Sequence, residues 1–391
     1  MSSVSTMEFA GPIADGVWRS AKDAPVAVNW QGMGDNPVQL ADGRVLIAGG
    51  QGTNFGSVSA CAVFDPGPGT WTTTGPLTEA RSGHTLTRLP DGTVLATGGY
   101  PMPQNTFAGL ATAERFDPIA GKWISAGSMS VGRTAHSATL LADGRVLVAG
   151  GYADRSGTSG TTATAEIYDP DAKTWTKIKP MNDARSVHQA VLLLDGRVLV
   201  IGGTADVGSG TYTDLAFCEI FDPATGEWTP TGSTARPRFD NTATVLLDGT
   251  VLVTGGGWPG WVAGWAFNTG SDWTTERYNP ATGVWTRDTD LSCARLYHRA
   301  ALLHDGRVLV IGGANAKNMS TGLRSTAIYD PATMSWHQAA GLATGRWAFG
   351  ALALADGRVL VTGGVDHLDG SSTNWRLTAS TEIYTPAEGE Q

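Results

Sequence analysis

Short apolar runs, each preceded by a polar turn, recur along the whole chain. The recurring unit is Asp-Gly, then Arg or Thr, Val-Leu, two further residues and Gly-Gly. Its seven copies are at 42–50, 91–99, 143–151, 195–203, 248–256, 305–313 and 356–364. Asp-Gly between apolar runs is a strong hairpin signal, because a type I′ turn needs positive φ at both central residues. Each copy therefore predicts a tight turn that leads into a buried strand.

Residues around each copy predict three more strands. Arg-x-x-His, as at 133–136, opens the strand before the turn, and Glu-x-Tyr/Phe-Asp-Pro, as at 166–170, ends a third strand. A Trp begins the fourth strand: Trp18, Trp71, Trp123, Trp175, Trp228, Trp285 and Trp336. A unit of about fifty residues cannot bury both faces of its own sheet, so it must stack on its neighbours. The pattern predicts a repeat protein of four-stranded units.

The last unit lacks its Trp, and one additional Trp lies ahead of the first turn. Trp18 precedes the first turn, whereas the last unit ends at Thr385 and Pro386 without a Trp. We therefore expect a strand at about 14–22 to complete the last unit, at about 340–386, and so remove the open edges of the array. No linker divides the chain, and the prediction is a single domain over residues 1–391.

Taken together, Arg-x-x-His, Asp-Gly-Arg-Val-Leu-Val-x-Gly-Gly, Glu-x-Tyr-Asp-Pro and the Trp resemble Kelch repeats over essentially the whole chain. The resemblance implies an all-β fold, a seven-bladed β-propeller whose paired glycines and repeat Trp pack blade against blade. It implies no single activity, because Kelch propellers include protein-interaction modules, sugar mutarotases, plant specifier proteins and the catalytic domain of galactose oxidase. Function must be sought in departures from the repeat.

Charge and cysteine usage limit the partners and the compartment. A net charge of −9 without a basic run makes nucleic acid and anionic membranes poor partners. The N-terminal residues lack a signal-peptide pattern and no apolar run is long enough to cross a membrane, so we expect a cytoplasmic protein, and a monomer. Cys61 and Cys218 share a small core position of the repeat, whereas Cys293 lies off the repeat with no base at a spacing that identifies a nucleophile.

Tryptophans outside the repeat position concentrate in two kinds of connection. They lie between strands two and three of a blade, or between one blade and the next: Trp30, Trp258, Trp261, Trp265, Trp273, Trp347 and Trp375. Because strands alternate in direction, these connections share one face, which predicts an aromatic pocket at the mouth of the propeller. The longest insertion, 257–272 in the fifth blade, could fold over the mouth as a lid, or could plug the central channel with a small apolar core.

One repeat position carries two titratable groups among small or apolar residues. In blade order the residue before the repeat His is Gly34, Gly83, Ala135, Val187, Asp240, Tyr297 and Ala348. Asp240 and Tyr297 stand on neighbouring inner strands and could form a proton-transfer pair, or a hydrogen-bonded tie between blades five and six. The repeat histidines are expected to be architectural, with His298 beside Tyr297 the candidate for a further role.

Other candidates complete the predicted site. A ring of repeat arginines near the axis could hold a carboxylate or phosphate. His367, between Asp366 and Asp369, could be a general base or a metal ligand, or a chance surface residue. The predicted catalytic residues are Asp240, Tyr297 and His298, and the predicted ligand-binding residues are Trp30, Asp35, Arg238, Trp258, Trp261, Trp265, Arg295, Trp347, His367 and Trp375.

Copper chemistry is a minor alternative. The run 295–298 ahead of the turn at 305–307 is similar to the stretch of galactose oxidase that supplies a Tyr and a His to copper. That family also needs a second Tyr, cross-linked to Cys, and a His from a later domain. Gly83 and Ala135 stand at the matching position, and no further domain follows the last repeat. No Cys/His cluster has zinc spacing and no nucleotide loop occurs, so we expect no metal and no cofactor.

Two classes of function are left. The first is a small-molecule site in the mouth: an enzyme doing cofactor-independent acid–base chemistry, such as isomerisation, cyclisation or elimination, or a binder of an aromatic or sugar ligand. The second is a protein-interaction platform on which the same aromatic residues anchor a partner. The sequence favours the first class and leaves the substrate open.

Overall fold

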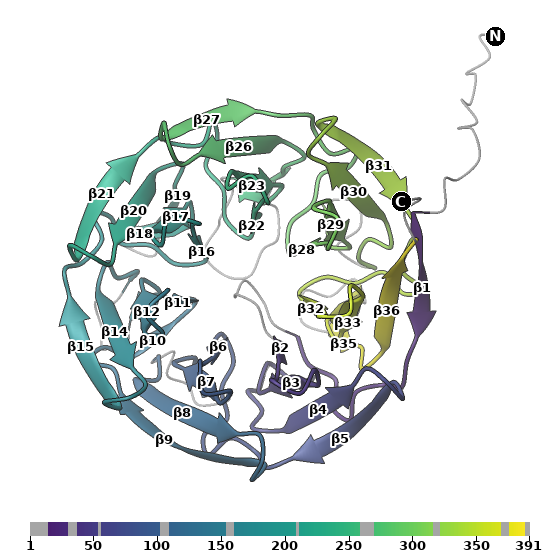
Figure 1. The fold of residues 1–391 in the computed structure, drawn as a ribbon, viewed down its shortest axis with the longest axis horizontal. Coiled ribbons are helices and arrows are strands. Elements are labelled where there is room, and N and C mark those ends of the chain that lie inside the picture. Colours follow the sequence, from purple (N-terminus) through teal and green to yellow (C-terminus); the bar gives the residue numbers. More distant parts are fainter. Residues whose placement is uncertain are drawn as a thin grey trace.

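The computed structural model describes residues 15–29, 37–53, 56–101, 109–153, 160–208, 211–258, 270–315, 321–368 and 375–387. These residues form seven four-stranded antiparallel sheets, arranged as blades around a central axis (Figure 1). The predicted all-β propeller with seven blades is therefore confirmed. Among the described residues, no helix is long and apolar enough to cross a membrane.

Each blade runs from an inner to an outer strand. The inner strands are β2 (Val38–Gln39), β6 (Thr85–Arg88), β11 (Ser137–Leu140), β16 (Gln189–Leu192), β22 (Thr242–Val245), β28 (Arg299–Leu302) and β32 (Gly350–Ala353). The second strands are β3 (Val45–Ala48), β7 (Val94–Thr97), β12 (Val146–Ala149), β17 (Val198–Ile201), β23 (Val251–Thr254), β29 (Val308–Ile311) and β33 (Val359–Thr362).

The outer half of each blade follows the Asp-Pro turns. The third strands are β4 (Cys61–Asp65), β8 (Thr112–Asp117), β14 (Ala165–Asp169), β20 (Cys218–Asp222), β26 (Thr275–Asn279), β30 (Thr326–Asp330) and β36 (Thr381–Pro386). The outer strands are β5 (Thr70–Thr74), β9 (Lys122–Ser128), β15 (Thr174–Ile178), β21 (Glu227–Thr231), β27 (Val284–Arg287), β31 (Ser335–Ala339) and β1 (Gly16–Ser20).

The hydrophobic core lies between neighbouring blades. All four residues of β17 are buried, as are those of β23, because a blade covers each face of the sheet. The two strands contribute Leu199 and Val253 to one cluster that spans blades four and five. Burial on both faces explains why the second strands read as continuous apolar runs rather than as an alternating pattern.

The paired glycines and the repeat Trp hold adjacent blades together. A Cβ on Gly98 would lie 2.4 Å from the carbonyl oxygen of Arg133 and 2.6 Å from the His136 ring, so only glycine allows the next blade to approach. On the outside, the indole of Trp228 donates a hydrogen bond of 2.9 Å to the carbonyl oxygen of Lys179 in the preceding blade. The sequence repeat is thus largely a set of contacts between blades.

Strand β1 closes the ring. It pairs with β36 from Gly16 opposite Pro386 to Ser20 opposite Glu382, and Trp18 packs on Tyr384 with ring centroids 5.2 Å apart. Figure 1 shows the purple first strand beside the yellow last one. The expected closure by the N-terminal strand is confirmed, and it gives the last blade its fourth strand.

On the face opposite the Asp-Gly turns, the connections form four short antiparallel ribbons in the described part of the chain. Three lie within connections between strands two and three of a blade, and one pairs the segment before the inner strand β11 with the connection after β12. The four ribbons are β10 (Arg133–Thr134) with β13 (Tyr152–Ala153), β18 (Thr204–Gly208) with β19 (Thr211–Asp214), β24 (Gly257–Trp258) with β25 (Gly270–Ser271), and β34 (Val365–Leu368) with β35 (Trp375–Leu377). The sequence indicated only loops here.

Candidate functional site

The residue before each repeat His has a left-handed backbone conformation in the described blades. The φ values are 63° for Gly83, 59° for Ala135, 47° for Val187, 49° for Asp240, 53° for Tyr297 and 50° for Ala348. The amide of Ala135 donates to the carbonyl of Gly83 at 3.0 Å, and that of Val187 to Ala135 at 3.0 Å, so this position ties one blade to the next. A left-handed conformation is costly for side chains other than glycine.

Asp240 and Tyr297 come together at the mouth end of the inner strands. Each lies one residue before the repeat His position of its blade. Their side chains share a hydrogen bond that joins blades five and six. The Asp240 side chain is buried, whereas Tyr297 is partly exposed. This hydrogen bond is compatible with both expectations, a proton-transfer pair and a tie between the two blades.

Burial changes the protonation of this pair. It raises the pKa of Asp240 to about 7; the nearby carboxyl of Asp214 adds to the rise, and Arg299 and the Tyr297 hydrogen bond oppose it. The pKa of Tyr297 is raised well above its ordinary value by burial and then by the charge of Asp240. Near neutral pH the Asp240 carboxyl can therefore either hold or release its proton, while Tyr297 stays a hydrogen-bond donor.

Three further polar residues act on this pair, and the sequence did not single out two of them. Asp214 is buried at the end of β19, and burial raises its pKa to about 6. Arg299 opens β28, and Tyr152 in β13 acts electrostatically on Asp240 and Tyr297. We call Asp214, Asp240, Tyr297, Arg299 and Tyr152 the mouth cluster. The five residues of the mouth cluster come from blades three to six.

A sequence signal for Arg299 exists, whereas the signal for Asp214 is weak. After the repeat His, the other described blades carry small or neutral residues: Thr85, Ser137, Gln189, Thr242 and Gly350. A single arginine at that position is a departure of the same kind as Asp240. Asp214 lies in a connection of variable length, where no repeat position exists for comparison.

Aromatic rings flank the mouth cluster on two sides. The rings of Tyr297 and Trp347 lie with centroids 5.3 Å apart, and those of Tyr152 and Tyr212 with centroids 5.9 Å apart. Trp347, however, is fully buried in a small cluster with Ala314 and Val365. Trp347 therefore packs against Tyr297 inside the protein and does not line an open pocket, which differs from its expected role as a ligand-binding residue.

His298 lies in the contact between blades and not with the pair. Its ring is fully buried, and Nε2 lies 3.1 Å from the hydroxyl of Thr242 and 3.3 Å from that of Thr254 in the preceding blade. His136 makes the equivalent contacts with Thr85 and Thr97. Burial lowers the pKa of His298 well below its ordinary value, which keeps it neutral. The structure thus assigns His298 the architectural role of the repeat histidines.

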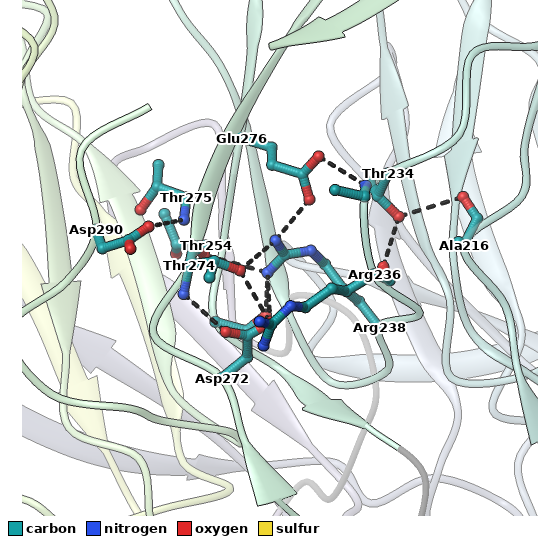
Figure 2. A network of polar contacts seen from close by, with 12 residues as sticks. Ala216, Thr234, Arg236, Arg238, Thr254, Asp272, Thr274, Thr275, Glu276 and Asp290 are labelled. Atoms are coloured by element: carbon teal, nitrogen blue, oxygen red, sulfur yellow. Dashed lines mark hydrogen bonds and ion pairs between the residues drawn. The ribbon is translucent and has the colours of Figure 1, made fainter. Parts of the chain in front are cut away.

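The repeat arginines are also internal. Arg238 is fully buried: it donates to the carbonyl of Gly255 at 2.8 Å, and to Glu276 Oε1 at 2.7 Å, with Asp272 at 3.6 Å (Figure 2). The carboxylate position beside Arg238 is therefore filled by the protein itself, which corrects its expected role as a ligand-binding residue. Arg295 is equally buried. The repeat arginines therefore do not form a free ring of positive charge at the mouth.

Several predicted ligand-binding residues lie outside the part of the chain that can be assessed. Trp30, Asp35, Trp261 and Trp265 fall outside the described residues, and with them most of the 257–272 insertion, whether lid or plug. For Trp258, His367 and Trp375 the structure gives the strands β24, β34 and β35. No group of three or more His, Cys, Asp or Glu side chains is gathered for a metal within the described ranges.

The opposite face carries a shallow hollow of about 540 Å³ between the first and last blades. Its charged walls include two ion pairs, Arg44 with Asp42 at 2.7 Å and Arg358 with Asp356 at 2.6 Å. These pairs belong to the Asp-Gly-Arg turns, so the charges there neutralise one another. The mouth cluster is the stronger candidate because its carboxyls are desolvated and only partly compensated.

A family model and known proteins of similar sequence point to the same repeat. A family model described as the KLHDC2/KLHL20/DRC7 Kelch-repeats domain matches residues 37–257. Kelch-like protein 26 of Danio rerio is 28% identical over 64% of this chain and 39% of its own length. Kelch-like protein terF of Aspergillus terreus is 28% identical over 58% of this chain and 47% of its own length. The chain thus spans less than half the length of these relatives.

A solved structure extends the likeness to the whole ring. A fungal alcohol oxidase of the AA5 family, in complex with copper, has a TM-score of 0.71, covering 95% of this chain and 76% of its own at 18% identity. At that identity the likeness shows the fold alone. The family model covers more than half of the chain, and the blades show the repeat's arginine, histidine, paired-glycine and Trp contacts between neighbours. The chain therefore belongs to the Kelch-repeat family.

Proposed function

We propose that this Kelch propeller is a binding module, and that its mouth cluster takes a basic group of a protein partner or a small ligand. The proposal rests mainly on one observation: Asp240, desolvated and bonded to Tyr297, lies beside a second desolvated carboxyl, Asp214. Two carboxyls and one arginine leave a net negative charge when both acids are ionised. An ammonium or guanidinium group would supply the missing positive charge.

The aromatic rings of the cluster suit the same ligand. Tyr297 is bonded to Asp240, and Tyr152 packs on Tyr212 with ring centroids 5.9 Å apart; a cation over a tyrosine face is attracted by the quadrupole of the ring. Binding a cation would lower the pKa of Asp240 and Asp214 and so release protons. Affinity should therefore rise as the pH increases through about 6 to 7, where these carboxyls lose their protons in the free protein.

A peptide array with basic, neutral and acidic sequences tests this proposal. Basic peptides should bind best, and Asp240→Asn or Asp214→Asn should weaken them by about tenfold or more, since each removes one carboxylate from a desolvated site. Asp195→Asn, on the Asp-Gly face and paired with Arg197, is the matched control and should leave binding unchanged. Equal binding of acidic peptides, or equal affinity of the Asp240→Asn protein, would contradict the proposal.

A second candidate function is cofactor-independent acid–base chemistry, an isomerase, cyclase or lyase reaction on an aromatic or carbohydrate-like substrate. The specific observation in its favour is that Asp240 titrates near neutrality while hydrogen-bonded to Tyr297. If a screen of sugars and aromatic metabolites finds turnover, Asp240→Asn and Tyr297→Phe should each reduce it by about 10²-fold or more. Turnover at the parental rate in both variants would leave the pair as an inter-blade tie.

A further inference from the structure

One buried arginine lacks the carboxylate that the other repeat arginines have. Five of them donate from Nη2 to a glutamate of their own blade, at 2.7 to 3.1 Å: Arg81, Arg133, Arg185, Arg238 and Arg346. Arg295 is equally buried, but Ala327 stands opposite Val310, where the next blade has Glu382 opposite Val361. Among the described residues, no carboxylate pairs with Arg295.

The first blade lacks both members of this ion pair. Ala62 stands opposite Ile47 at the glutamate position, and the sequence has Gly32 at the arginine position. Blade six therefore differs from the other six blades, because it has the arginine without the acid. A buried charge that has no partner is strongly destabilising, so Arg295 needs a negative charge from another source.

Hydrogen bonds to neutral oxygens hold the Arg295 guanidinium in place. It donates to the carbonyls of Gly312 and Ser325 at 3.0 and 3.2 Å, and to the hydroxyl of Ser325 at 3.3 Å. Burial lowers the pKa of Arg295 to about 10, so the guanidinium is still charged at neutral pH. These bonds fix the direction of the guanidinium without neutralising it.

A backbone amide also binds each of the five glutamates. The amide three residues before the arginine donates to Oε2 of the glutamate at 2.7 to 2.8 Å, from Thr78, Ser130, Asn182, Ala235 and Ala343. The corresponding amide in blade six is that of Ser292, which makes no hydrogen bond within the described part of the chain. Arg295 and Ser292 thus supply both donors of the glutamate site.

The backbone around Ser292 follows the same course as in the other blades. The amide of Leu291 donates to the carbonyl of Trp273 at 2.8 Å, as Leu342 does to Arg324 in the next blade. On the other side, the amide of Arg295 donates to the carbonyl of Asp272 at 2.9 Å. The Ser292 amide is therefore held between two bonds that the repeat shares, and blade six differs mainly in the side chain at residue 327.

The atoms that an alanine lacks relative to a glutamate correspond to one small ion. Beyond Cβ, a glutamate has Cγ, Cδ and two carboxylate oxygens, and these are the heavy atoms of acetate. Ser292 is exposed and Cys293 is partly exposed, so this part of the blade is accessible from solvent. A carboxylate that bridges a guanidinium and an amide makes charge-assisted hydrogen bonds, which are stronger than those between neutral groups.

We infer that blade six contains a binding site for a small carboxylate of the size of acetate. One oxygen of the ligand accepts from Nη2 of Arg295 and the other from the amide of Ser292, as Oε1 and Oε2 of Glu382 do with Arg346 and Ala343. The site is distinct from the mouth cluster, and its ligand has the opposite charge to the one proposed there. Binding compensates the buried guanidinium and so stabilises the folded chain.

Thermal unfolding of the full chain in different sodium salts tests this inference. Acetate at about 100 mM should raise the melting temperature by about 3 °C, since a dissociation constant of about 1 mM makes the folded state about a hundredfold more favoured. Trimethylacetate has the same charge on a bulkier group, and chloride offers a single acceptor atom, so both should have little effect. Equal rises in the three salts would overturn the inference, because they would show a general salt effect.

Supplying the carboxylate within the chain gives the matched variants. Ala327→Glu should melt above the parent without acetate, and acetate should then act on it no more than chloride does. Ala327→Gln has nearly the same size without the charge and should melt below Ala327→Glu. An undiminished response of Ala327→Glu to acetate would contradict the inference, as would equal melting of the two variants.

A variant in blade seven keeps the test independent of packing around residue 327. Glu382→Ala removes the carboxylate from Arg346 and from the amide of Ala343, and so reproduces the arrangement of blade six. It should melt below the parent in chloride, and acetate should raise its melting temperature more than that of the parent, because two sites then bind. If acetate helps this variant no more than chloride does, a guanidinium and an amide in this arrangement do not hold a free carboxylate, and the inference fails.

Discussion

Asp240 links proton concentration to the stability of the fold. Its pKa in the folded protein is about 7, against an ordinary value of 3.8, so the folded state holds this proton to higher pH than the unfolded state does. The stabilising contribution is fully present below pH 3.8 and is lost as the pH rises to about 7. The free energy of unfolding should fall by roughly 3 to 4 kcal/mol across this interval.

Urea denaturation at a series of pH values, on the parent and on Asp240→Asn, measures this loss. The amide does not titrate, so the variant should keep only the smaller decline that Asp214 contributes with its pKa of about 6. Parallel stability curves for the two proteins would show that Asp240 is solvated in the folded state. The same curves would then weaken the case for its role in ligand binding.

At the scale of single residues, departures from the repeat indicated where the candidate site lies. Asp240 and Tyr297 stood out because other blades hold small residues at their position, and the structure brings these two side chains together. His298 and Arg238 could not be separated from their repeat equivalents by sequence. Their side chains make the same contacts as those equivalents: His298 bonds to Thr242 of the preceding blade, and Arg238 bonds to Glu276 of its own blade.

At the scale of elements, the tight left-handed position before each inner strand invites a stability test. Val187 has φ of 47° and is partly exposed, so it bears the cost of a β-branched residue in this conformation without much packing in return. Val187→Gly should raise the free energy of unfolding by about 0.5 to 1 kcal/mol, the relief of strain exceeding the entropy that glycine adds to the unfolded chain.

The matched control lies in the next strand along the chain. Val200 is fully buried in β17 with ordinary extended backbone, so Val200→Gly should lower the free energy of unfolding by about 3 kcal/mol or more. Chemical denaturation of both variants decides the matter. A loss of stability in Val187→Gly would mean that the packing of this side chain outweighs its backbone strain.

Strands and turns were predictable where the repeat is regular, and not elsewhere. Asp-Gly turns, buried second strands and Asp-Pro turns recur in each blade because every blade needs the same contacts with its neighbours. The ribbons β18–β19 and β24–β25 have no such constraint, since their lengths and residues differ from blade to blade. Asp214 belongs to one of these ribbons, and for this reason the sequence did not predict it as a second carboxyl of the mouth cluster.

At the scale of the whole molecule, stability depends on closure of the ring. Deleting residues 1–25 would remove β1, leave the outer-edge backbone groups of β36 unpaired and remove the contact between Trp18 and Tyr384. We expect a loss of more than about 3 kcal/mol in the free energy of unfolding. Val17→Ala, which trims an exposed residue of the same strand, should change it little. An unchanged melting temperature of the truncated protein would refute the prediction.

The pairing of β1 with β36 also has a consequence for the order of events during synthesis. Of the strands that the structure describes, the ribosome makes β1 before the others, whereas its partner β36 is made after the others. Strand β1 must therefore wait unpaired, and its pairing has the longest sequence separation among the described strand pairs, so we expect it to form slowly. Nascent chains would expose two open sheet edges throughout this wait, a state prone to association with other chains. Among the described strands, β1 is thus made first and can pair only when β36 has been made.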